Sequence, residues 1–138
     1  MKFPLVVLLL SILAISSVSA YDDEIIAKYQ EIIRLRTKSV ENAKKQEGRD
    51  PGIIESLEME LLKTKAELAE EQNDIASQIS YIQESIKILT KTRDRFNAIA
   101  EGDETMANMS IGIDIGILQL ETEILKLRRK NEQPIKSQ

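Results

Sequence analysis

The side chains that could do chemistry are few, and most of them are carboxylates. The chain contains no Cys, His or Trp, so it offers no imidazole base, no thiolate nucleophile and no soft ligand for zinc or copper. The acids Glu70 and Glu71, and the pair Glu121 and Glu123, stand close together in sequence. Residues one or two positions apart on a helix, however, do not face each other. We therefore expect no enzyme activity, no cofactor and no metal site.

One motif for covalent modification occurs at Asn108-Met109-Ser110, which matches the acceptor sequence for N-glycosylation. Asn108 is therefore a candidate glycosylation site, provided that the chain enters the secretory pathway. The motif falls within a segment for which we expect a helix.

Composition and charge narrow the class of protein. Of the 138 residues, 42% are hydrophobic and 30% are charged, which is typical of a soluble, helix-rich single domain. The 19 basic and 23 acidic side chains give a net charge of −4. A nucleic-acid-binding protein normally carries a basic surface, so we expect no nucleic-acid partner.

Residues 1–20 have the pattern of a secretory signal peptide. Lys2 precedes an apolar run over residues 5–15, and Val18-Ser19-Ala20 follows a short polar stretch. This ending predicts cleavage between Ala20 and Tyr21. The apolar run is too short to span a bilayer of about 30 Å as a helix; an uncleaved signal anchor is the alternative. We expect residues 21–138 to form a single secreted, extracellular domain.

Turn-forming residues divide this domain into helices. Gly48 is a natural helix end, Asp50 is a natural N-cap, and Pro51 fits the first turn of a helix. No Gly or Pro occurs over residues 53–101, and Asp103 after Gly102 is a candidate N-cap for the last helix. We expect helices over about 22–47, 52–100 and 104–131, followed by a tail at 132–138.

The long middle segment carries a heptad repeat. Seven apolar residues stand seven positions apart, namely Ile54, Leu61, Leu68, Ile75, Ile82, Leu89 and Phe96. This helix seam predicts an all-α, elongated antiparallel bundle or coiled coil of three helices with a long central helix. The alternative is a four-helix up-and-down bundle in which the central segment breaks near Asn73 and Asp74.

Blocks of alternating net charge indicate which helices are neighbours. Residues 27–49 are net basic and residues 50–74 net acidic, while residues 75–100 are net basic and residues 101–125 net acidic. Complementary charge favours antiparallel packing of the first helix on the first half of the middle segment. The same reasoning places the last helix on its second half.

The last segment has two apolar stripes at helical spacing, one from Met106 to Leu127 and a second from Ile111 to Leu125. Residues 109–117 also alternate as a strand would, which is a competing interpretation. We favour a helix because the flanking pattern is helical and no other segment offers a partner strand. The candidate contact face for a partner comprises Ile111, Gly112, Ile115, Gly116 and Leu118.

Two functions from different classes fit this sequence. The first is a secreted, non-enzymatic coiled-coil protein that acts by protein–protein interaction or self-association in an extracellular fluid or gland secretion. The second rests on composition: a Cys-free, aromatic-poor secreted chain of amphipathic helices resembles the insect apolipophorin and apolipoprotein families. This resemblance implies an exchangeable bundle that opens to lay its apolar faces on lipid. Lipid is therefore the alternative partner.

Overall fold

A computed structural model describes the backbone of residues 3–133 and the side chains of residues 20–133. This part of the chain consists of four α-helices without a strand: α1 (Phe3–Lys45), α2 (Pro51–Glu71), α3 (Ile75–Ile99) and α4 (Glu104–Glu132). The predicted all-α class is confirmed. Residues 109–117 are helical, so the strand interpretation of that segment is wrong.

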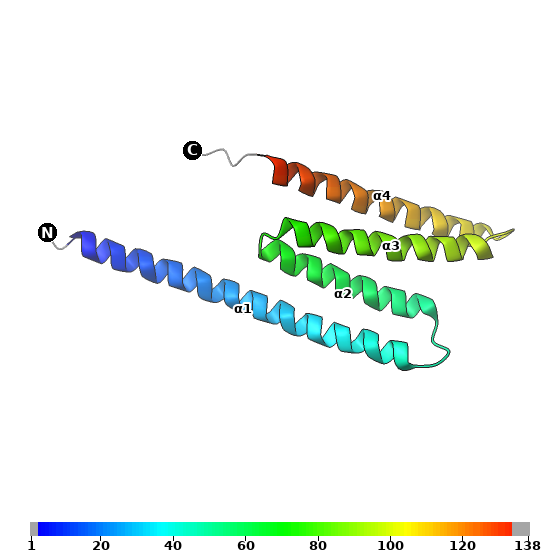
Figure 1. The fold of residues 1–138 in the computed structure, drawn as a ribbon, viewed down its shortest axis with the longest axis horizontal. Coiled ribbons are helices and arrows are strands. Elements are labelled where there is room, and N and C mark those ends of the chain that lie inside the picture. Colours follow the sequence, from blue (N-terminus) through cyan, green and yellow to red (C-terminus); the bar gives the residue numbers. More distant parts are fainter. Residues whose placement is uncertain (1–2, 134–138) are drawn as a thin grey trace.

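The helices lie side by side in chain order and alternate in direction (Figure 1). Packing occurs between α1 and α2, between α2 and α3, and between α3 and α4, whereas no other pair of helices packs in the described part of the chain. The N-terminal part of α1 extends past the other helices (Figure 1). The fold is an open up-and-down array with two uncovered outer faces, on α1 and α4.

The expected unbroken helix over residues 52–100 is wrong, because the chain turns back at residues 72–74. Asn73 adopts a left-handed φ of 54°, a conformation that Asn tolerates better than most residues. Its N–H donates to the Glu70 carbonyl at 3.0 Å, and the Asp74 N–H donates to the Ala69 carbonyl at 2.8 Å. These two bonds form a Schellman motif, which closes the end of α2. The three-helix prediction is therefore replaced by four helices.

Asp74 begins the next helix directly. Its carboxylate accepts hydrogen bonds from the Ser77 N–H at 3.0 Å and from the Ser77 hydroxyl at 2.6 Å. One carboxylate thus caps two donors at the start of α3. The hydrogen bonds from Ser77 also hold the pKa of Asp74 below its ordinary value.

The other two turns form where the sequence predicts them. Gly48 has a φ of 74°, and the Asp50 carboxylate accepts from the Gly52 N–H at 2.9 Å, with Pro51 as the first residue of α2. Gly102 has a φ of 90°, and Asp103 caps α4. These glycines occupy the left-handed region that other side chains rarely adopt.

α1 begins earlier than the expected residue 22. The helix is continuous through Ala20 and Tyr21, both exposed. The side chains of residues 1–19, and so most of the proposed signal peptide, lie outside the described side chains. The predicted tail at 132–138 lies almost entirely outside the described residues, and cleavage after Ala20 stays a prediction.

The seven-residue helix seam is divided between two antiparallel helices. Ile54, Leu61 and Leu68 lie on α2, and the other four residues lie on α3. Ile82 is buried and the remaining six are half-buried. The repeat is therefore real as a pattern of burial, but it does not form one continuous seam.

The buried interior is small and partly polar. Its apolar members are Val40, Ala43, Leu62, Ala69, Ile82, Ile117 and Ile124. Five polar residues are equally buried, namely Glu55, Thr64, Gln78, Ser85 and Ser110. The hydroxyls of Thr64 and Ser85 each donate to a carbonyl one turn earlier in their own helix, so burying them leaves no hydroxyl unpaired.

Ion pairs connect the neighbouring helices that the charge blocks predict. Between α1 and α2, Lys44 lies 2.5 Å from Glu58 and Arg36 lies 3.4 Å from Glu60. Between α3 and α4, Arg93 lies 3.1 Å from Asp114. The predicted neighbour pairs are confirmed. Exposed pairs of this kind contribute little stability each, so they act mainly on the choice of neighbour.

Candidate functional site

The most distinctive surface feature is a row of aliphatic side chains on the outer side of α4. We call it the α4 outer seam and define it as Ile111, Ile115, Leu118, Thr122 and Leu125. Its aliphatic members are between 52% and 61% exposed. The spacing between members alternates between four and three residues, which keeps all five on one side of a helix.

Packing of the opposite side of α4 fixes the direction in which this seam points. Ile117 and Ile124 are buried, on the side that meets α3. At 100° per residue, the seam lies about 130° around the helix from these residues. Asp114 on α4 pairs with Arg93, and Ser110 donates to the Asn97 side chain of α3. These contacts hold the rotation of α4 about its axis.

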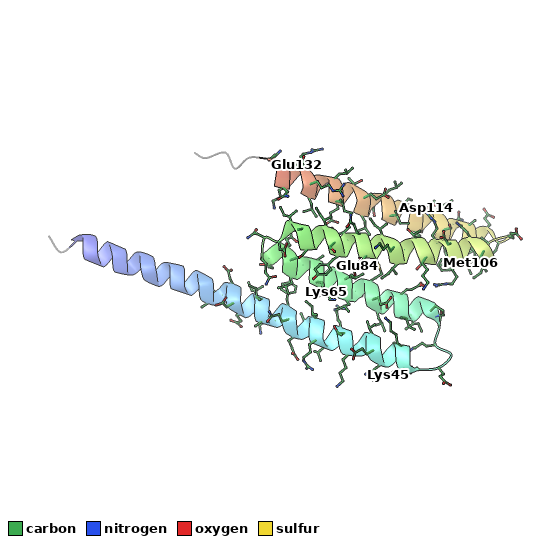
Figure 2. All side chains as sticks on the ribbon, in the orientation of Figure 1. Lys45, Lys65, Glu84, Met106, Asp114 and Glu132 are labelled. Carbon is green, nitrogen blue, oxygen red and sulfur yellow. The ribbon has the colours of Figure 1, made fainter. Side chains whose placement is uncertain are left out.

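Figure 2 shows that no helix lies beyond α4 on the side facing away from α3. The α4 outer seam is therefore not covered by any of the described residues. Its one polar member, Thr122, donates its hydroxyl to the Leu118 carbonyl at 2.8 Å. The seam thus presents no polar group that a partner would leave unpaired.

The predicted contact face overlaps this seam but does not coincide with it. Ile111, Ile115 and Leu118 belong to the seam, and Gly112 is exposed beside it. A Cβ on Gly112 would meet no atom within 4 Å, whereas one on Gly116 would lie 3.9 Å from Leu89 Cδ1. Gly116 therefore belongs to the side that packs on α3, and four of the five predicted residues lie at the free surface.

Charged and amide side chains flank the seam. Asp114 and Glu121 lie along one edge, and Gln119 and Lys126 lie along the other. Glu121, Gln119 and Lys126 are exposed, while Asp114 is half-buried by its pair with Arg93. The two edges thus differ in charge, which is a feature that can select the orientation of a helical partner.

A second cluster of charged groups lies between α2 and α3. Arg95 donates two hydrogen bonds to the Glu55 carboxylate, at 2.6 and 2.7 Å, and the Thr92 hydroxyl donates a third at 2.7 Å. Glu55 is only 7% exposed. Hydrogen bonding from Arg95 holds the pKa of Glu55 below its ordinary value, against the opposing effect of burial.

This cluster is structural in character. Both carboxylate oxygens accept bidentate bonds from a guanidinium, so Glu55 stays ionised and has no proton to donate. The one hydroxyl that faces it among the described contacts, that of Thr92, also lies 2.9 Å from the Ile88 carbonyl of its own helix. We therefore assign the cluster to the pairing of α2 with α3.

A shallow groove lies over α3, between α2 and α4. The buried Leu62 and Ile82 and the half-buried Leu120 line it, together with the exposed acids Glu70 and Glu123. These acids belong to different helices and make no described hydrogen bond to each other. The groove thus has an apolar floor with charged side chains along its sides.

The candidate glycosylation site has a buried component. Asn108 is exposed on α4, but Ser110 of the same motif is only 5% exposed and donates its hydroxyl to Asn97. The motif is therefore helical and partly covered in the folded chain. Attachment of a glycan at Asn108 stays a prediction.

The sequence interpretation missed the Glu55–Arg95 pair, although signals for it exist. Glu55 stands seven positions before Leu62 and fourteen before Ala69, and both of these are buried. A carboxylate that shares a buried helix face with apolar residues needs a cationic partner, because burying an unpaired charge is costly. Once the chain turns at Asn73, Arg95 on α3 comes opposite Glu55, but an unbroken helix would keep them far apart.

Two further findings concern the described part of the chain. No helix within it is long and apolar enough to cross a membrane. No group of three or more Asp or Glu side chains within it could hold a metal ion. Comparisons with protein-family models, with curated proteins and with solved structures gave no match.

Proposed function

We propose that this chain is a secreted, non-enzymatic helical protein that acts by binding another helix through the α4 outer seam. The observation that carries the proposal is the exposure of four large aliphatic side chains, each more than half accessible, at coiled-coil spacing on one helix. Scattered exposed apolar residues are normal on a surface, whereas a continuous row marks an interaction site.

The rigidity of α4 supports this proposal. Its inner side is held to α3 by buried isoleucines and by the Arg93–Asp114 pair. A partner helix would therefore meet a preformed row of side chains and would order little of the chain on binding. Preorganisation of this kind improves affinity by lowering the entropy lost in association.

The test measures association of the protein produced from its full sequence in a eukaryotic expression host. Sedimentation velocity detects self-association. Fluorescence anisotropy detects binding to a labelled heptad peptide with Ile at position a, Leu at position d, Lys at e and Glu at g. We expect association in at least one assay, and we expect Leu118→Asp to abolish it.

Met109→Asp is the matched control, because Met109 is 47% exposed on the same helix but lies outside the seam. It should associate like the wild type. An absence of both kinds of association in the wild type contradicts the proposal, and so does equal loss in the two variants.

Lipid binding is the second candidate function, and the open array favours it. Each helix packs only on its sequence neighbours, and α1 also carries exposed apolar residues at Tyr21, Ile25, Ile32 and Leu35. Such an array could spread on a surface without breaking many contacts. Addition of phosphatidylcholine vesicles should then shift the protein into the vesicle fraction with its helicity retained, whereas unchanged sedimentation counts against this function.

Secretion is proposed from the pattern of residues 1–20. Protein recovered from the culture medium should begin at Tyr21 when its intact mass is measured. Recovery only from the membrane fraction, with residues 1–20 still attached, contradicts cleavage after Ala20 and supports a signal anchor.

A further inference from the structure

We propose that the occupant of the α4 outer seam is α4 of a second copy, paired in parallel and in register to form a two-stranded coiled coil. The inference rests on the proposed function and specifies the partner and its orientation. It is carried by the residue types within the seam, by the charges along its two edges and by the side of α4 on which it lies.

The seam fits heptad positions a and d of a parallel dimer. Taking Leu118 as d, Ile115 and Thr122 fall at position a, and Leu125 falls at the next d. β-Branched residues at a with Leu at d favour two parallel strands. Asn108 falls at a, one heptad before Ile115 and outside the seam, so pairing at this position requires an Asn108 without a glycan. Arg129 follows at the next position a, beyond the end of the seam.

The charges along the edges also select the parallel orientation. In a parallel pair, position g of one helix meets position e of the next heptad on the other helix. This rule places Glu121 beside Lys126 of the second copy, twice by symmetry, and Asp114 beside Gln119 of the second copy. An antiparallel pair with Leu118 opposite Thr122 would instead bring the two Glu121 side chains together. At Glu121, parallel pairing gains an ion pair in each copy, whereas the antiparallel register brings like charges together; the antiparallel register also sets Arg128 near Asp114, but that carboxylate is already paired with Arg93.

The position of the seam permits this arrangement without a collision. It faces nearly opposite to the side of α4 that packs on α3, so the second copy approaches from open solvent. The two copies would form one array of eight helices with the paired α4 helices at its centre. The contact between one seam and another, from Ile111 to Leu125, is about 21 Å long.

An interface of this length is at the small end for specific complexes, so the dimer should be reversible and concentration-dependent, with a dissociation constant of about micromolar order. Glu121→Lys replaces both ion pairs by repulsions and should raise that constant by roughly tenfold. Lys126→Glu should do the same. Mixing the two variants should yield a heterodimer about as tight as the wild-type dimer, because the exchanged charges become complementary again.

The absence of cysteine from the sequence makes disulfide trapping a clean test. Leu118→Cys in the full-chain protein should form a covalent dimer under mild oxidation, since parallel pairing brings the two position-118 side chains within disulfide reach. Met109→Cys, on the same helix but outside the seam, should form little. Circular dichroism should show unchanged helicity in both variants.

Orientation is tested by mixing. In the antiparallel alternative, a mixture of Leu118→Cys and Thr122→Cys chains cross-links between different variants, and Leu118→Cys alone does not. That result overturns the proposal, as does a Leu118→Cys yield no higher than that of Met109→Cys. The Leu118→Cys yield could be no higher than the Met109→Cys yield while the chain still binds the heptad peptide through Leu118. In that case the proposed function stands, and only a second copy of the chain is excluded as the partner.

Discussion

The packed sides of α2 and α3 and the outer side of α4 distribute polar and apolar side chains in opposite ways. Between α2 and α3, the buried set includes Glu55, Gln78 and Ser85. On the outer side of α4, aliphatic side chains are more than half exposed. A single soluble domain would normally show the reverse distribution.

The difference shows which side chains hold the helices of one chain together and which are free to contact another molecule. Small residues such as Ser85 and Ala69 let two helices approach closely, and Arg95 neutralises the buried Glu55. The fold of the array therefore needs few large apolar side chains inside. The larger aliphatic side chains of α4 remain available for contact with another molecule.

The largest expected effect on unfolding free energy is the difference between substitutions at two adjacent residues of α4. Ile117 is 7% exposed and Leu118 is 61% exposed. Ile117→Asp buries an unpaired charge and should cost more than about 4 kcal/mol of unfolding free energy, enough to unfold most of the chain. Leu118→Asp should change it by less than about 0.5 kcal/mol. Urea unfolding followed by circular dichroism measures both, and equal losses would remove the distinction between the two sides of α4.

Removing the cation that pairs with Glu55 should have the next largest effect. Arg95→Met keeps the aliphatic stem but leaves a buried carboxylate without its partner, which should cost about 3 kcal/mol. Lys63→Met, at an exposed position of α2, is the control and should cost little. If Arg95→Met unfolds at the same urea concentration as the wild type, the Glu55 cluster does not stabilise the pairing of α2 with α3.

Acidification should weaken this same cluster. Because the folded pKa of Glu55 lies below its ordinary value of 4.5, its stabilising effect is present at neutral pH and is lost as the pH falls through that folded pKa. The stability advantage of wild type over Glu55→Gln should therefore shrink between pH 7 and pH 3. An advantage that stays constant or grows in acid would contradict the ion pair.

The smallest effect concerns the turn that brings α2 against α3. Asn73→Ala places a less tolerant residue in the left-handed conformation and should cost about 1 kcal/mol. Asn73→Gly should be at least as stable as the wild type, since Gly is the usual residue at this position of a Schellman motif. Equal unfolding midpoints for Ala and Gly at position 73 would show that the left-handed conformation is not needed.

The all-α class, two of the three turns and the neighbour pairs could be predicted from sequence, because Gly, Pro and Asp caps and blocks of charge are local signals. The turn at Asn73 could not be predicted with the same ease. It uses Asn in place of Gly, and it interrupts a heptad pattern that continues on both sides. Periodicity alone cannot tell one long helix from two antiparallel helices whose repeats happen to be in phase.

The free surface of α4 was predicted in outline. Its second apolar stripe is visible in the sequence, and a helix in an array of this size cannot bury both stripes. Which stripe packs depends on α3, through Leu89, Arg93 and Asn97. Those contacts arise only once the chain direction is known, so the assignment of Gly116 to the packed side required the structure.

The most direct test of the helix-binding role of α4 is sedimentation velocity on wild type and Leu118→Asp, each measured over a concentration series and again with excess heptad peptide. We expect the wild type to gain mass, by pairing with itself or by binding peptide, and we expect Leu118→Asp to keep the mass of one chain with unchanged helicity. A wild type that keeps the mass of one chain under every condition would contradict the assignment of the α4 outer seam as an interaction surface.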